Sequence, residues 1–410
     1  MTQSHLTPGN AFIKYRIKGQ DLVPWEHFED FEHTDTIAGD VERHRLVLWD
    51  EEWDTVENLI LLGNEEVEYE FGWVEGPQSN RFQAQVFRYD PEFLPTGARL
   101  TVEGTDWSMV SNQQVKNRAF EDMLISEVIE QIAGENGWDA VVEPTATTTR
   151  QTWLQTNLSD PKFIESVLLR EAINEKLQGD YRFFFRGGRE LHFHTGTYQS
   201  GGRIYRKYIF ARERTGQMLA FKPHYNGELV TAMGGFSQRV VAVDPVERKV
   251  ITHDSNDTTT PEKDLLGPKG IRAKGVTREF ARLYPLPFDT QAEIEEWSRH
   301  KYSMAQQMLW TATAEIVGDP EILAGDLIEV LMIISKGPSA GKPHPASGVF
   351  LVNVAIHKID ARGTYTTTLE LNRNGLVEGD MELTGQPVAG ASGGEGAGGG
   401  GVPVSSVPAG

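Results

Sequence analysis

The sequence predicts an α+β protein that is predominantly β, in which two β domains flank a small α+β domain. Period-two runs of β-branched and aromatic residues fill residues 10–110 and return after residue 202. Between these regions, apolar residues recur at helical spacing beside helix start and stop signals. A chain of 410 residues is long enough for two or three domains with sizeable cores.

The first β domain is predicted over residues 1–110. Its candidate strands are Ala11–Lys18, Arg43–Trp49, Glu66–Trp73 and Arg81–Arg88. A short helix is expected at Trp53–Leu61. Pro95-Thr96-Gly97 is a turn that leads into a strand at Ala98–Glu103, and Gly104-Thr105-Asp106 closes the domain.

A small α+β domain is predicted over residues 111–200, and its first element is a helix. The spacing of Phe120, Leu124, Val128 and Ile132 at every fourth position gives the helix one apolar face. The glycines from Gly134 to Gly137 are expected to end it.

A second helix and a hairpin complete the α+β domain. Asp160 is the expected N-cap, with Pro161 at the first helical position, where a missing N–H costs nothing. Ile164, Leu168 and Ala172 share one face, and Gly179 ends the helix. The hairpin strands are Tyr181–Phe185 and Glu190–His194, joined by Arg186-Gly187-Gly188-Arg189.

The second β domain is predicted over residues 201–380, with an inserted loop and helix at about 244–310. Its polar segment His253–Lys269 is typical of an exposed loop. Thr290 and Glu293 form a capping box that begins a helix running to about Trp310, with an apolar stripe on one face. The tail over 381–410 is dominated by Gly, Ala, Ser, Val and Pro, so it is expected to be a flexible end or linker.

The end of the second β domain has clear turn signals between its strands. Gly318-Asp319-Pro320 and Ala324-Gly325-Asp326 are turns, and Arg362-Gly363 is a tight turn. The expected strands are Thr311–Val317, Leu327–Ile334, Gly348–Asp360 and a last one from Thr364 that alternates with period two. Lys336–Ser347, rich in Pro and Gly, is predicted to be a loop.

Composition excludes several classes of protein. The chain has no cysteine, so disulfides and thiolate metal sites are ruled out, as suits assembly in a reducing cytoplasm. The 39 basic and 59 acidic residues give a net charge of −20, which disfavours nucleic-acid binding. No window approaches the ~20 apolar residues of a membrane helix. The start of the chain lacks the pattern of a signal peptide, so we expect a soluble protein that is not exported by that route.

Charge is unevenly distributed along the chain. Residues 51–75 contain nine acids and no Lys or Arg, whereas residues 181–222 contain nine bases and only two acids. Two solvated faces would explain this pattern. Alternatively, the acidic segment lines a conduit that must not retain DNA, and the basic segment docks against an acidic neighbour.

The candidate chemical sites are weak. Glu190, His192 and His194 alternate along one strand, but an extended strand separates the outer two by roughly 13 Å, too far to share one metal ion. A surface or core-edge histidine pair is the simpler interpretation. Acidic pairs such as Glu51 with Glu52, or Glu65 with Glu66, are the kind of carboxylates used in glycoside hydrolysis, yet an acidic composition produces them by chance.

Three further motifs have ordinary explanations. Gly-Xaa-Ser-Xaa-Gly occurs at 337–341 and 390–394, without the strand before and helix after that a nucleophile elbow needs. Gly187-Gly188 joins two strands and precedes no helix, so it does not predict a phosphate loop. Tryptophans crowd the first domain, where core or interface packing is a commoner use than sugar stacking: Trp25, Trp49, Trp53, Trp73 and Trp107. We therefore expect no catalytic, cofactor-binding or metal site, and no enzyme.

Two stretches resemble a known family. One is the helix from Thr290, the segment 318–326 and the strands that end in Gly363-Thr364-Tyr365-Thr366-Thr367-Thr368-Leu369. The other is 158–164, followed by the aromatic strands at 181–185 and 191–193. Together they span residues 155–378 and are similar to the late control protein D family, the baseplate hub proteins of contractile phage tails. That family is similar in turn to the hub part of the type VI secretion spike protein VgrG.

The resemblance implies a structural role. It implies two related barrel-like tube domains per chain, so that three chains form a ring with pseudo-sixfold symmetry between a sixfold tail tube and a threefold central spike. A closed ring also removes exposed strand edges. The implied partners are two further copies of the chain, the tail tube protein or its initiator, the spike, other baseplate proteins and the tape measure protein.

The implied location is the tail baseplate of a virion assembled in the host cytoplasm, with the channel open to DNA or effector passage. The alternative is a tail protein that binds or cleaves cell-wall glycan through the tryptophan-rich domain. A separate lysozyme-like domain would add ~100–150 residues, and no unassigned block of that size exists.

Overall fold

The fold is described from a computed structural model. The described residues are 11–17, 20–21, 28–37, 41–53, 65–106, 114–145, 150–169, 171–172, 181–195, 205–210, 217–225, 238–243, 250–255, 280–283, 310–334, 337, 340–344 and 346–373. Contacts divide the chain into two units, 1–378 and 379–410, and all of the described residues belong to the first. The predicted helix from Thr290, the helix at Trp53–Leu61 beyond Trp53, and the C-terminal tail lie outside the described residues.

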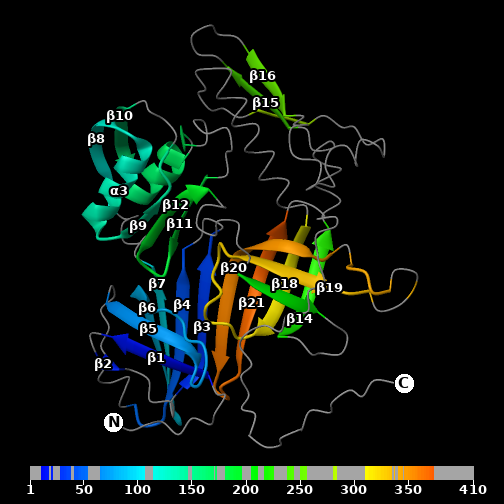
Figure 1. Ribbon diagram of the computed structural model, residues 1–410. Helices are drawn as coiled ribbons and strands as arrows, with labels where there is room; N and C mark the ends of the chain where they lie inside the picture. The colour runs from blue at the N-terminus through cyan, green and yellow to red at the C-terminus, as the bar shows by residue number, and fades with distance from the viewer. Residues whose placement is uncertain are drawn as a thin grey trace, which may run out of the picture. The chain divides into compact units, whose positions relative to one another are not determined.

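The first half of the main sheet contains seven strands (Figure 1). They are β1 (Ala11–Ile17), β2 (Gln20–Asp21), β3 (Phe28–Thr36), β4 (Arg43–Asp50), β5 (Glu66–Trp73), β6 (Phe82–Leu94) and β7 (Gly97–Thr105). The strands predicted for this region are confirmed, although β6 runs six residues further than expected, to Leu94. Strand β3 was not predicted, because Phe28 and Phe31 are three positions apart across a register irregularity, and the other buried positions of the strand are polar.

The α+β part contains β8 (Lys116–Met123), α3 (Ile125–Asn136), β9 (Asp139–Val142), β10 (Gln151–Leu158), β11 (Tyr181–Arg186) and β12 (Glu190–Thr195). Its second helix begins as α4 (Asp160–Phe163) and continues as a π-helical turn, η2 (Ile164–Leu168). The predicted hairpin is confirmed, with Arg186 opposite Glu190. Ile164, Leu168 and Ala172 are buried together, as their spacing predicts.

Two helix boundaries in this part differ from the prediction. Phe120 lies in strand β8, and α3 begins only after Leu124, whose N–H donates to the Glu127 carboxylate at 2.9 Å. Gly134 is inside the helix, and Gly137, with φ of +70°, ends it. Ser159 rather than Asp160 is the N-cap of α4. The Asp160 carboxylate instead binds Lys116 and Arg118 at 2.6 and 2.7 Å.

The second half of the main sheet contains β13 (Arg206–Phe210), β14 (Met218–Tyr225), β18 (Trp310–Val317), β19 (Leu327–Met332), β20 (Gly348–Asp360) and β21 (Tyr365–Arg373). A separate small sheet contains β15 (Gln238–Val243), β16 (Val250–Ser255) and β17 (Phe280–Leu283). His253 therefore lies in strand β16 rather than in the predicted loop, because Val250 and Ile251 extend a strand that pairs with β15.

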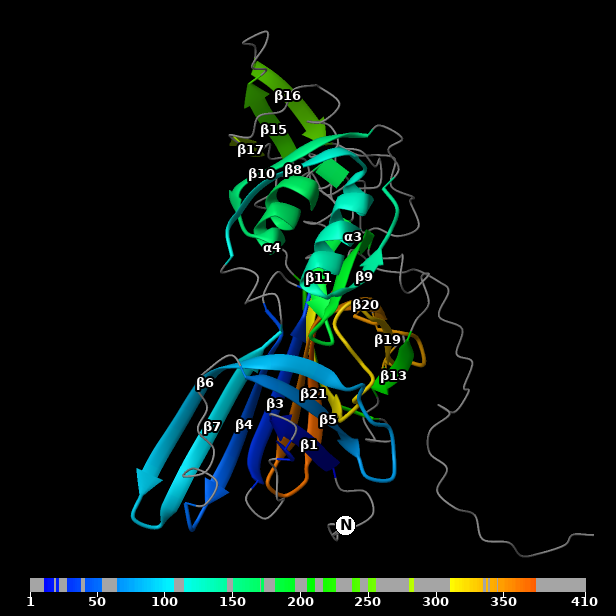
Figure 2. The ribbon, with the colours of Figure 1, turned by 90° about the vertical axis from the view of Figure 1, so that its left-hand side faces the viewer.

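The main sheet runs without interruption through both halves. Its strand order is β14-β18-β21-β20-β3-β4-β7-β6-β5-β1-β2, with β19 pairing both β20 and β13. Neighbours along the main path are antiparallel. Figure 2 shows β6 and β7 lying side by side as one long hairpin. The junction of the two halves is the pair β20 and β3.

The two halves repeat the same strand pairings. In chain order, β3, β4, β5, β6 and β7 pair with one another as β14, β18, β19, β20 and β21 do. The irregularities repeat as well. The β6–β7 ladder shifts register between the fifth and seventh residues of β6, and the β20–β21 ladder shifts at the same positions of β20. Ladders β3–β4 and β14–β18 both shift between the first and third residues of their first strand. No such repeat is visible in the amino-acid sequence, because the two halves share their strand pairing and register but not their residue types.

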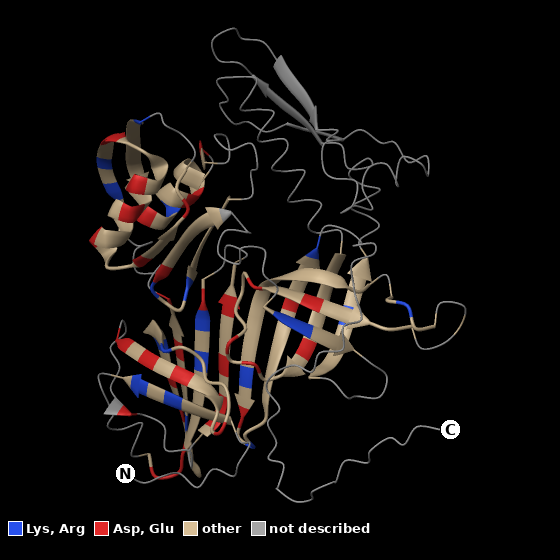
Figure 3. Cartoon of the chain, viewed as in Figure 1, with Lys and Arg blue, Asp and Glu red and all other residues tan. Residues whose placement is uncertain are grey.

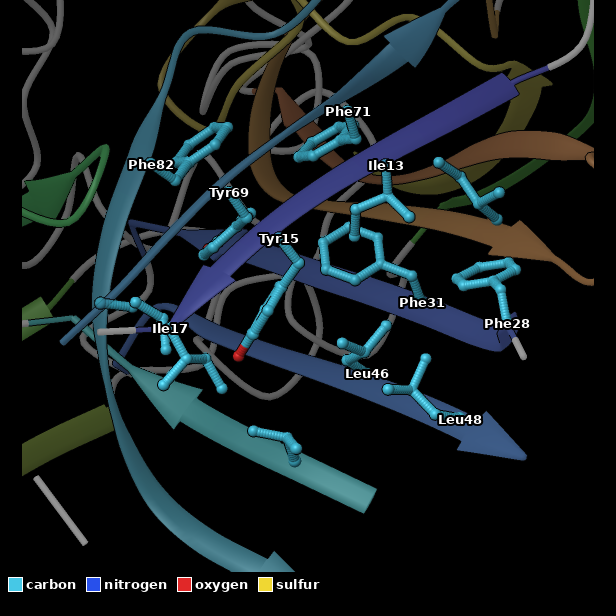
Figure 4. Packing of buried hydrophobic residues seen from close by; sticks show 14 of the residues in the cluster. Ile13, Tyr15, Ile17, Phe28, Phe31, Leu46, Leu48, Tyr69, Phe71 and Phe82 are labelled. Carbon is cyan, nitrogen blue, oxygen red and sulfur yellow. The ribbon is translucent and has the colours of Figure 1, made fainter. Parts of the chain in front are cut away.

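Three clusters of buried hydrophobic residues form the core. The first lies in the first half of the sheet and is strongly aromatic, with Tyr15, Phe31, Tyr69, Phe71 and Phe82 directed toward one another (Figure 4). The second lies between α3, the second helix and the β11–β12 hairpin. The third lies in the second half and is mostly aliphatic. The aromatic cluster is therefore the part of the core in which polar ring atoms must also find partners.

Candidate functional site at the seam between the two sheet halves

The most distinctive site is the seam, which we define as β3, β20 and the side chains beneath them. The strands pair from Val354 opposite Thr36 to Asp360 opposite Asp30. On the inward face, Ile359 of the second half is fully buried in the aromatic cluster of the first half, beside Tyr365. The core of the first half is thus completed by residues that arrive more than 250 positions later in the chain.

Three buried histidines lie under the seam, and each contacts a tyrosine hydroxyl. His357 Nδ1 is 2.8 Å from the Tyr365 hydroxyl, and its Nε2 is 3.1 Å from the carbonyl oxygen of Ile322. A carbonyl only accepts, so Nε2 carries the hydrogen and Nδ1 accepts from the tyrosine. His33 Nδ1 lies 3.0 Å from the Tyr69 hydroxyl, and His44 Nε2 lies 2.7 Å from the Tyr15 hydroxyl.

Burial keeps these histidines neutral. It lowers the pKa of both His44 and His357 to about 3, with a small opposing contribution at His357 from the Ile322 carbonyl. The pKa of His33 is lowered further from its usual range by burial and by the proximity of His357 and His44. A charged imidazole in this apolar setting would lack solvation. The cluster is therefore a hydrogen-bonded part of the core at neutral pH.

Glu42 connects the seam to the β11–β12 hairpin. Its carboxylate accepts hydrogen bonds from the backbone N–H groups of Gly187 at 3.2 Å and Gly188 at 2.8 Å. Both glycines have positive φ, +64° and +85°, which turns their N–H groups toward one point. Burial, followed by the nearby carboxylates of Asp35 and Asp106, raises the pKa of Glu42. The N–H groups of the hairpin tip thus bind a carboxyl group, and that group is a side chain of the same protein.

Gly188 also fixes how closely the hairpin approaches the sheet. A Cβ atom at this position would lie 1.7 Å from the carbonyl oxygen of Gln83 in β6, a distance that backbone atoms cannot tolerate. A Cβ at Gly187 would meet nothing within 4 Å. Of the two glycines, only Gly188 is therefore required by close packing.

The turns at 318–326 close the seam from the other side. Asp35 of β3 accepts a hydrogen bond from the Ala324 N–H at 2.7 Å, and burial raises the pKa of Asp35 to about 7. Arg186 reaches Asp326 at 3.3 Å. Gly318 lies against the Tyr365 ring, where a Cβ would come within 2.2 Å of ring carbons. The Gly-Asp-Pro turn predicted from the sequence is therefore a packing element of the seam.

The outward face of the seam is polar and carries mixed charge. A shallow hollow of about 650 Å³ is lined by Glu32, Arg43, Arg45, Glu103 and seam residues from β20. Arg45 binds Asp30 at 2.5 Å, and Lys358 lies 3.9 Å from Asp30 and Glu32. This arrangement compensates charge across strands and brings no nucleophile and base together.

The histidine pair, which the sequence places on the surface or at the edge of the core, is buried. His192 Nδ1 and His194 Nε2 are 3.1 Å apart, and His192 Nε2 is 3.3 Å from the Glu190 carboxylate. The His192 ring stacks on Phe184 with centroids 4.8 Å apart, which explains the burial. Within the described ranges, no group of three or more His, Cys, Asp or Glu side chains has the arrangement of a metal site.

Basic and acidic residues lie on neighbouring strands of the main sheet (Figure 3). In the acidic segment 51–75, Glu70 binds Lys14 of β1, and Glu68 lies 3.5 Å from Arg81. In the basic segment 181–222, Arg189 reaches Glu66 at 3.8 Å, and Arg186, Arg206 and Lys207 form ion pairs with Asp326, Asp319 and Glu329 respectively. Four of the described bases of this segment thus have acidic partners in the same chain, which weakens the docking interpretation.

The tryptophans that are described serve packing. Trp73 Nε1 donates to the Gly318 carbonyl at 2.8 Å, and the Trp49 ring lies where a Cβ of Gly97 would be. Trp53 is partly exposed and meets Phe93 edge to face, with centroids 5.1 Å apart. Trp25, Trp107, Ser339 and the 390–394 motif lie outside the described residues. Glu51 and Glu52 are exposed, and Glu65 and Glu66 are neighbours at the start of β5.

Sequence reasoning missed the histidines of the seam and Glu42. A usable signal exists in the strand alternation. His33 has the same parity as Phe31 in β3, and His44 has the same parity as Leu46 in β4. Period-two alternation therefore places both histidines on the apolar face. Glu42 precedes β4 and has no such pattern, so only the fold identifies it.

The comparisons with known proteins concern the fold. No family model matches the sequence, and no curated protein matches it. Among solved structures, the chain is similar to a tail protein of Neisseria meningitidis MC58, with a TM-score of 0.62 and 10% identity over 90% of this chain and 98% of the other. It is also similar to the 43 kDa tail protein of prophage MuSo2 from Shewanella oneidensis, with a TM-score of 0.63 and 9% identity over 89% and 98%.

A third neighbour is an Escherichia coli component of the type VI secretion system, described as structurally similar to the T4 tail proteins gp27 and gp5. It has a TM-score of 0.51 and 11% identity over 88% of this chain and 76% of the other. The chain therefore has the fold of phage tail proteins. Across the described residues, no helix is long and apolar enough to span a membrane.

Proposed function

We propose that this protein is a structural baseplate hub of a phage tail or a related injection machine. Three copies would form a ring that joins a sixfold tail tube to a threefold spike. The observation that carries this proposal is the repeat of one strand topology in a single continuous sheet, because two such units per chain give six units in three chains. The fold shared with tail proteins over nearly their whole length supports the same role.

The seam gives the proposed role a physical basis. An adaptor must hold its two sheet units in a fixed relation while the machine is loaded. Here the two units share a strand ladder, and one core is completed by side chains of the other half. Glu42 and Asp35 fasten the hairpin tip and the 318–326 turns to the same point. These contacts fix the positions of the elements relative to one another, and they do not bring together a nucleophile and a base.

The proposed domain organisation follows the same division. We propose a first tube domain over 1–110, a small α+β domain over 111–200 and a second tube domain over 201–380, followed by a flexible tail at 381–410. The three hydrophobic clusters support this division, although Leu323, Ile359 and Tyr365 belong to the first cluster. In a ring of three copies, the outward face of each sheet would line the channel, so that passing DNA or an effector would meet a surface on which basic and acidic side chains are paired.

Mass photometry of the purified protein tests the role. The expected result is particles of three chains, and electron cryomicroscopy of them should show threefold symmetry with six similar sheet units. A monomer at all concentrations, or a true hexamer, would contradict the hub assignment. Zymography on peptidoglycan addresses the glycan-cleaving alternative, and turnover that one carboxylate substitution in 51–75 abolishes would favour that alternative instead.

A further inference from the structure

Two of the longer strand edges in the main sheet have no strand partner among the described residues. Strand β5 pairs with β6 only from Phe82 to Gln85, so β6 is unpaired on that edge from Phe87 to Leu94. Strand β14 pairs with β18 alone. Unpaired edges of this length are templates for pairing with another strand.

The open part of β6 has the residue pattern of a covered strand. Pro91 and Phe93 are apolar and face one side, whereas Arg88, Asp90 and Glu92 face the other. Such alternation is typical of a strand with one buried face. Yet Phe93 is 53% exposed, and its neighbour Trp53 is 36% exposed. Among the described residues, the inward face of this strand therefore has no complete covering layer.

The internal repeat identifies what covers that face. β6 corresponds to β20, because both have 13 residues and the same register shift. β14 corresponds to β3, again with a matching shift. Within the chain, β20 pairs with β3 to form the seam. The repeat therefore assigns β14 as the partner of β6, and because β14 and β6 stand at opposite ends of an eight-strand path, this β14 must belong to another copy.

We propose that the open edge of β6 in one copy pairs with β14 of the next copy, in the register of the seam. This proposal deepens the proposed function, since it rests on the ring of three copies and names the surface that closes it. The path from β14 to β6 contains eight strands that alternate in direction. Because eight is even, β14 of the next copy meets β6 antiparallel, as every neighbour along the path does.

The side chains at the transferred register are complementary. In the seam, Lys358 lies opposite Glu32 at 3.9 Å. The corresponding residues are Glu92 in β6 and Lys222 in β14, so the same ion pair returns with its charges exchanged. One rung further, the seam pair Ile359 and Phe31 corresponds to Phe93 and Phe221. Phe93 is thus placed against the core of the next copy, as Ile359 is placed in the core of the first half.

One rung of the joint differs from the seam. His357 opposite His33 corresponds to Pro91 opposite Pro223, and proline has no N–H to donate. The joint between copies therefore has fewer ladder hydrogen bonds than the seam within the chain. Prolines at this rung also discourage pairing with unrelated strands. The side-chain pairs make the joint specific. The missing ladder hydrogen bonds make it weaker than the seam.

Disulfide trapping in the full chain tests the register. The protein has no cysteine, so Glu92→Cys combined with Lys222→Cys introduces the sole thiols. The expected product after mild oxidation is a covalent trimer on a denaturing gel, because directly opposite residues lie about 4.5–5.5 Å apart, within disulfide range. Each single variant should stay monomeric on the gel. Glu92→Cys with His224→Cys is the matched control, two residues out of register, and should cross-link at least tenfold less.

Charge exchange gives an independent measurement. Glu92→Lys or Lys222→Glu alone should lower the association constant about fivefold, the effect of one exposed ion pair, and the two changes together should restore it. Mass photometry on the reduced proteins measures this, and circular dichroism checks that each variant is folded.

The outcomes separate the surface from the hub role. Trimers that resist cross-linking in register would overturn the surface and leave the hub assignment intact. Cross-linked chains that grow beyond three copies would support the surface and contradict the ring of three. Protein that stays monomeric and uncrosslinked would overturn both.

Discussion

The seam and the open edges occupy the same position in two copies of one topology, and their chemistry differs. In the seam, the inward rung of β20 and β3 consists of two fully buried histidines. At the open edges, the corresponding residues are prolines, and the neighbouring positions carry an exposed phenylalanine and exposed charges. The same strand topology therefore carries a buried histidine–tyrosine network in the seam and prolines beside exposed side chains at the open edges.

The difference reflects the stage at which each strand finds its partner, during folding in the seam and during association of copies at the open edges. The two strands of the seam belong to one chain, so they are together whenever the protein is folded, and the hydrogen bonds between the buried histidines and tyrosines form with the fold. A strand that waits for another copy spends time in water, where a half-satisfied polar network would be costly and an unguarded edge would aggregate. The following changes test this contrast, beginning with the largest expected effect.

Gly188→Val tests whether the contact between the β11–β12 hairpin and strand β6 has room for additional atoms. The new Cβ would collide with the Gln83 carbonyl and would adopt a φ that β-branched residues avoid. We expect a loss of about 4 kcal/mol or more in the free energy of unfolding, measured by urea denaturation. Gly187→Ala is the control, and it should lose only about 1 kcal/mol, from its positive φ. Equal losses at the two positions would contradict the close approach of the hairpin.

His357→Ala tests the network itself, and Pro91→Ala tests the corresponding position on the open edge. The histidine change removes the acceptor of the Tyr365 hydroxyl and the donor to the Ile322 carbonyl and opens a cavity, so we expect a loss of about 3 kcal/mol in the free energy of unfolding. Pro91→Ala should change the unfolding free energy by less than about 0.5 kcal/mol. In the His357→Ala background, Tyr365→Phe should cost about 1 kcal/mol less than in the wild type, because the two side chains are coupled.

Asp35→Asn changes how stability depends on pH. Burial raises the pKa of Asp35 to about 7, so its contribution to stability is present at low pH and lost as the pH rises toward 7. His44 and His357, with pKa values lowered to about 3, act in the opposite sense, and their contribution is lost as the pH falls below about 6.5.

Without Asp35, its share of the loss with rising pH disappears, while the effects of the histidines and of Glu42, whose pKa burial also raises, remain. The free energy of unfolding of the variant, taken relative to that of the wild type, should rise by about 2 kcal/mol from pH 5 to pH 7. Urea denaturation at the two pH values measures the gain. Parallel stability profiles for the two proteins would show that Asp35 does not titrate in this range.

Lys358→Ala should have the smallest effect. Its ammonium is half exposed and 3.9 Å from both carboxylates, so the loss in unfolding free energy should be below about 1 kcal/mol. Glu92→Ala should leave the stability of the separate chain within about 0.5 kcal/mol. A loss above 2 kcal/mol at Lys358, seen in thermal or urea unfolding, would mean that surface charge rather than the buried network holds the seam.

Much of the fold could be predicted from the sequence because the information is local. Alternation identified β5 and β20 with their observed ends, and proline and glycine identified the turns at 318–326 and 362–363. Helix α3 was misplaced because Phe120 fits a four-residue period while its backbone pairs with β10. The seam could not be predicted, since it joins residues 30–36 to 354–360 and depends on contacts that no local pattern encodes.

The seam also determines how the protein would carry a mechanical load. Tension along β3 and β20 acts on all the rungs from Thr36 to Asp30 at once, so they must shear together. Tension across the strands opens one rung at a time, as a zipper does. The hairpin tip resists the same pull through discrete side-chain contacts, namely the two hydrogen bonds to Glu42 and the ion pairs of Arg186 with Asp326 and of Arg189 with Glu66. Under a pull that reaches both attachments, the hairpin tip would separate first and the sheet would stay whole.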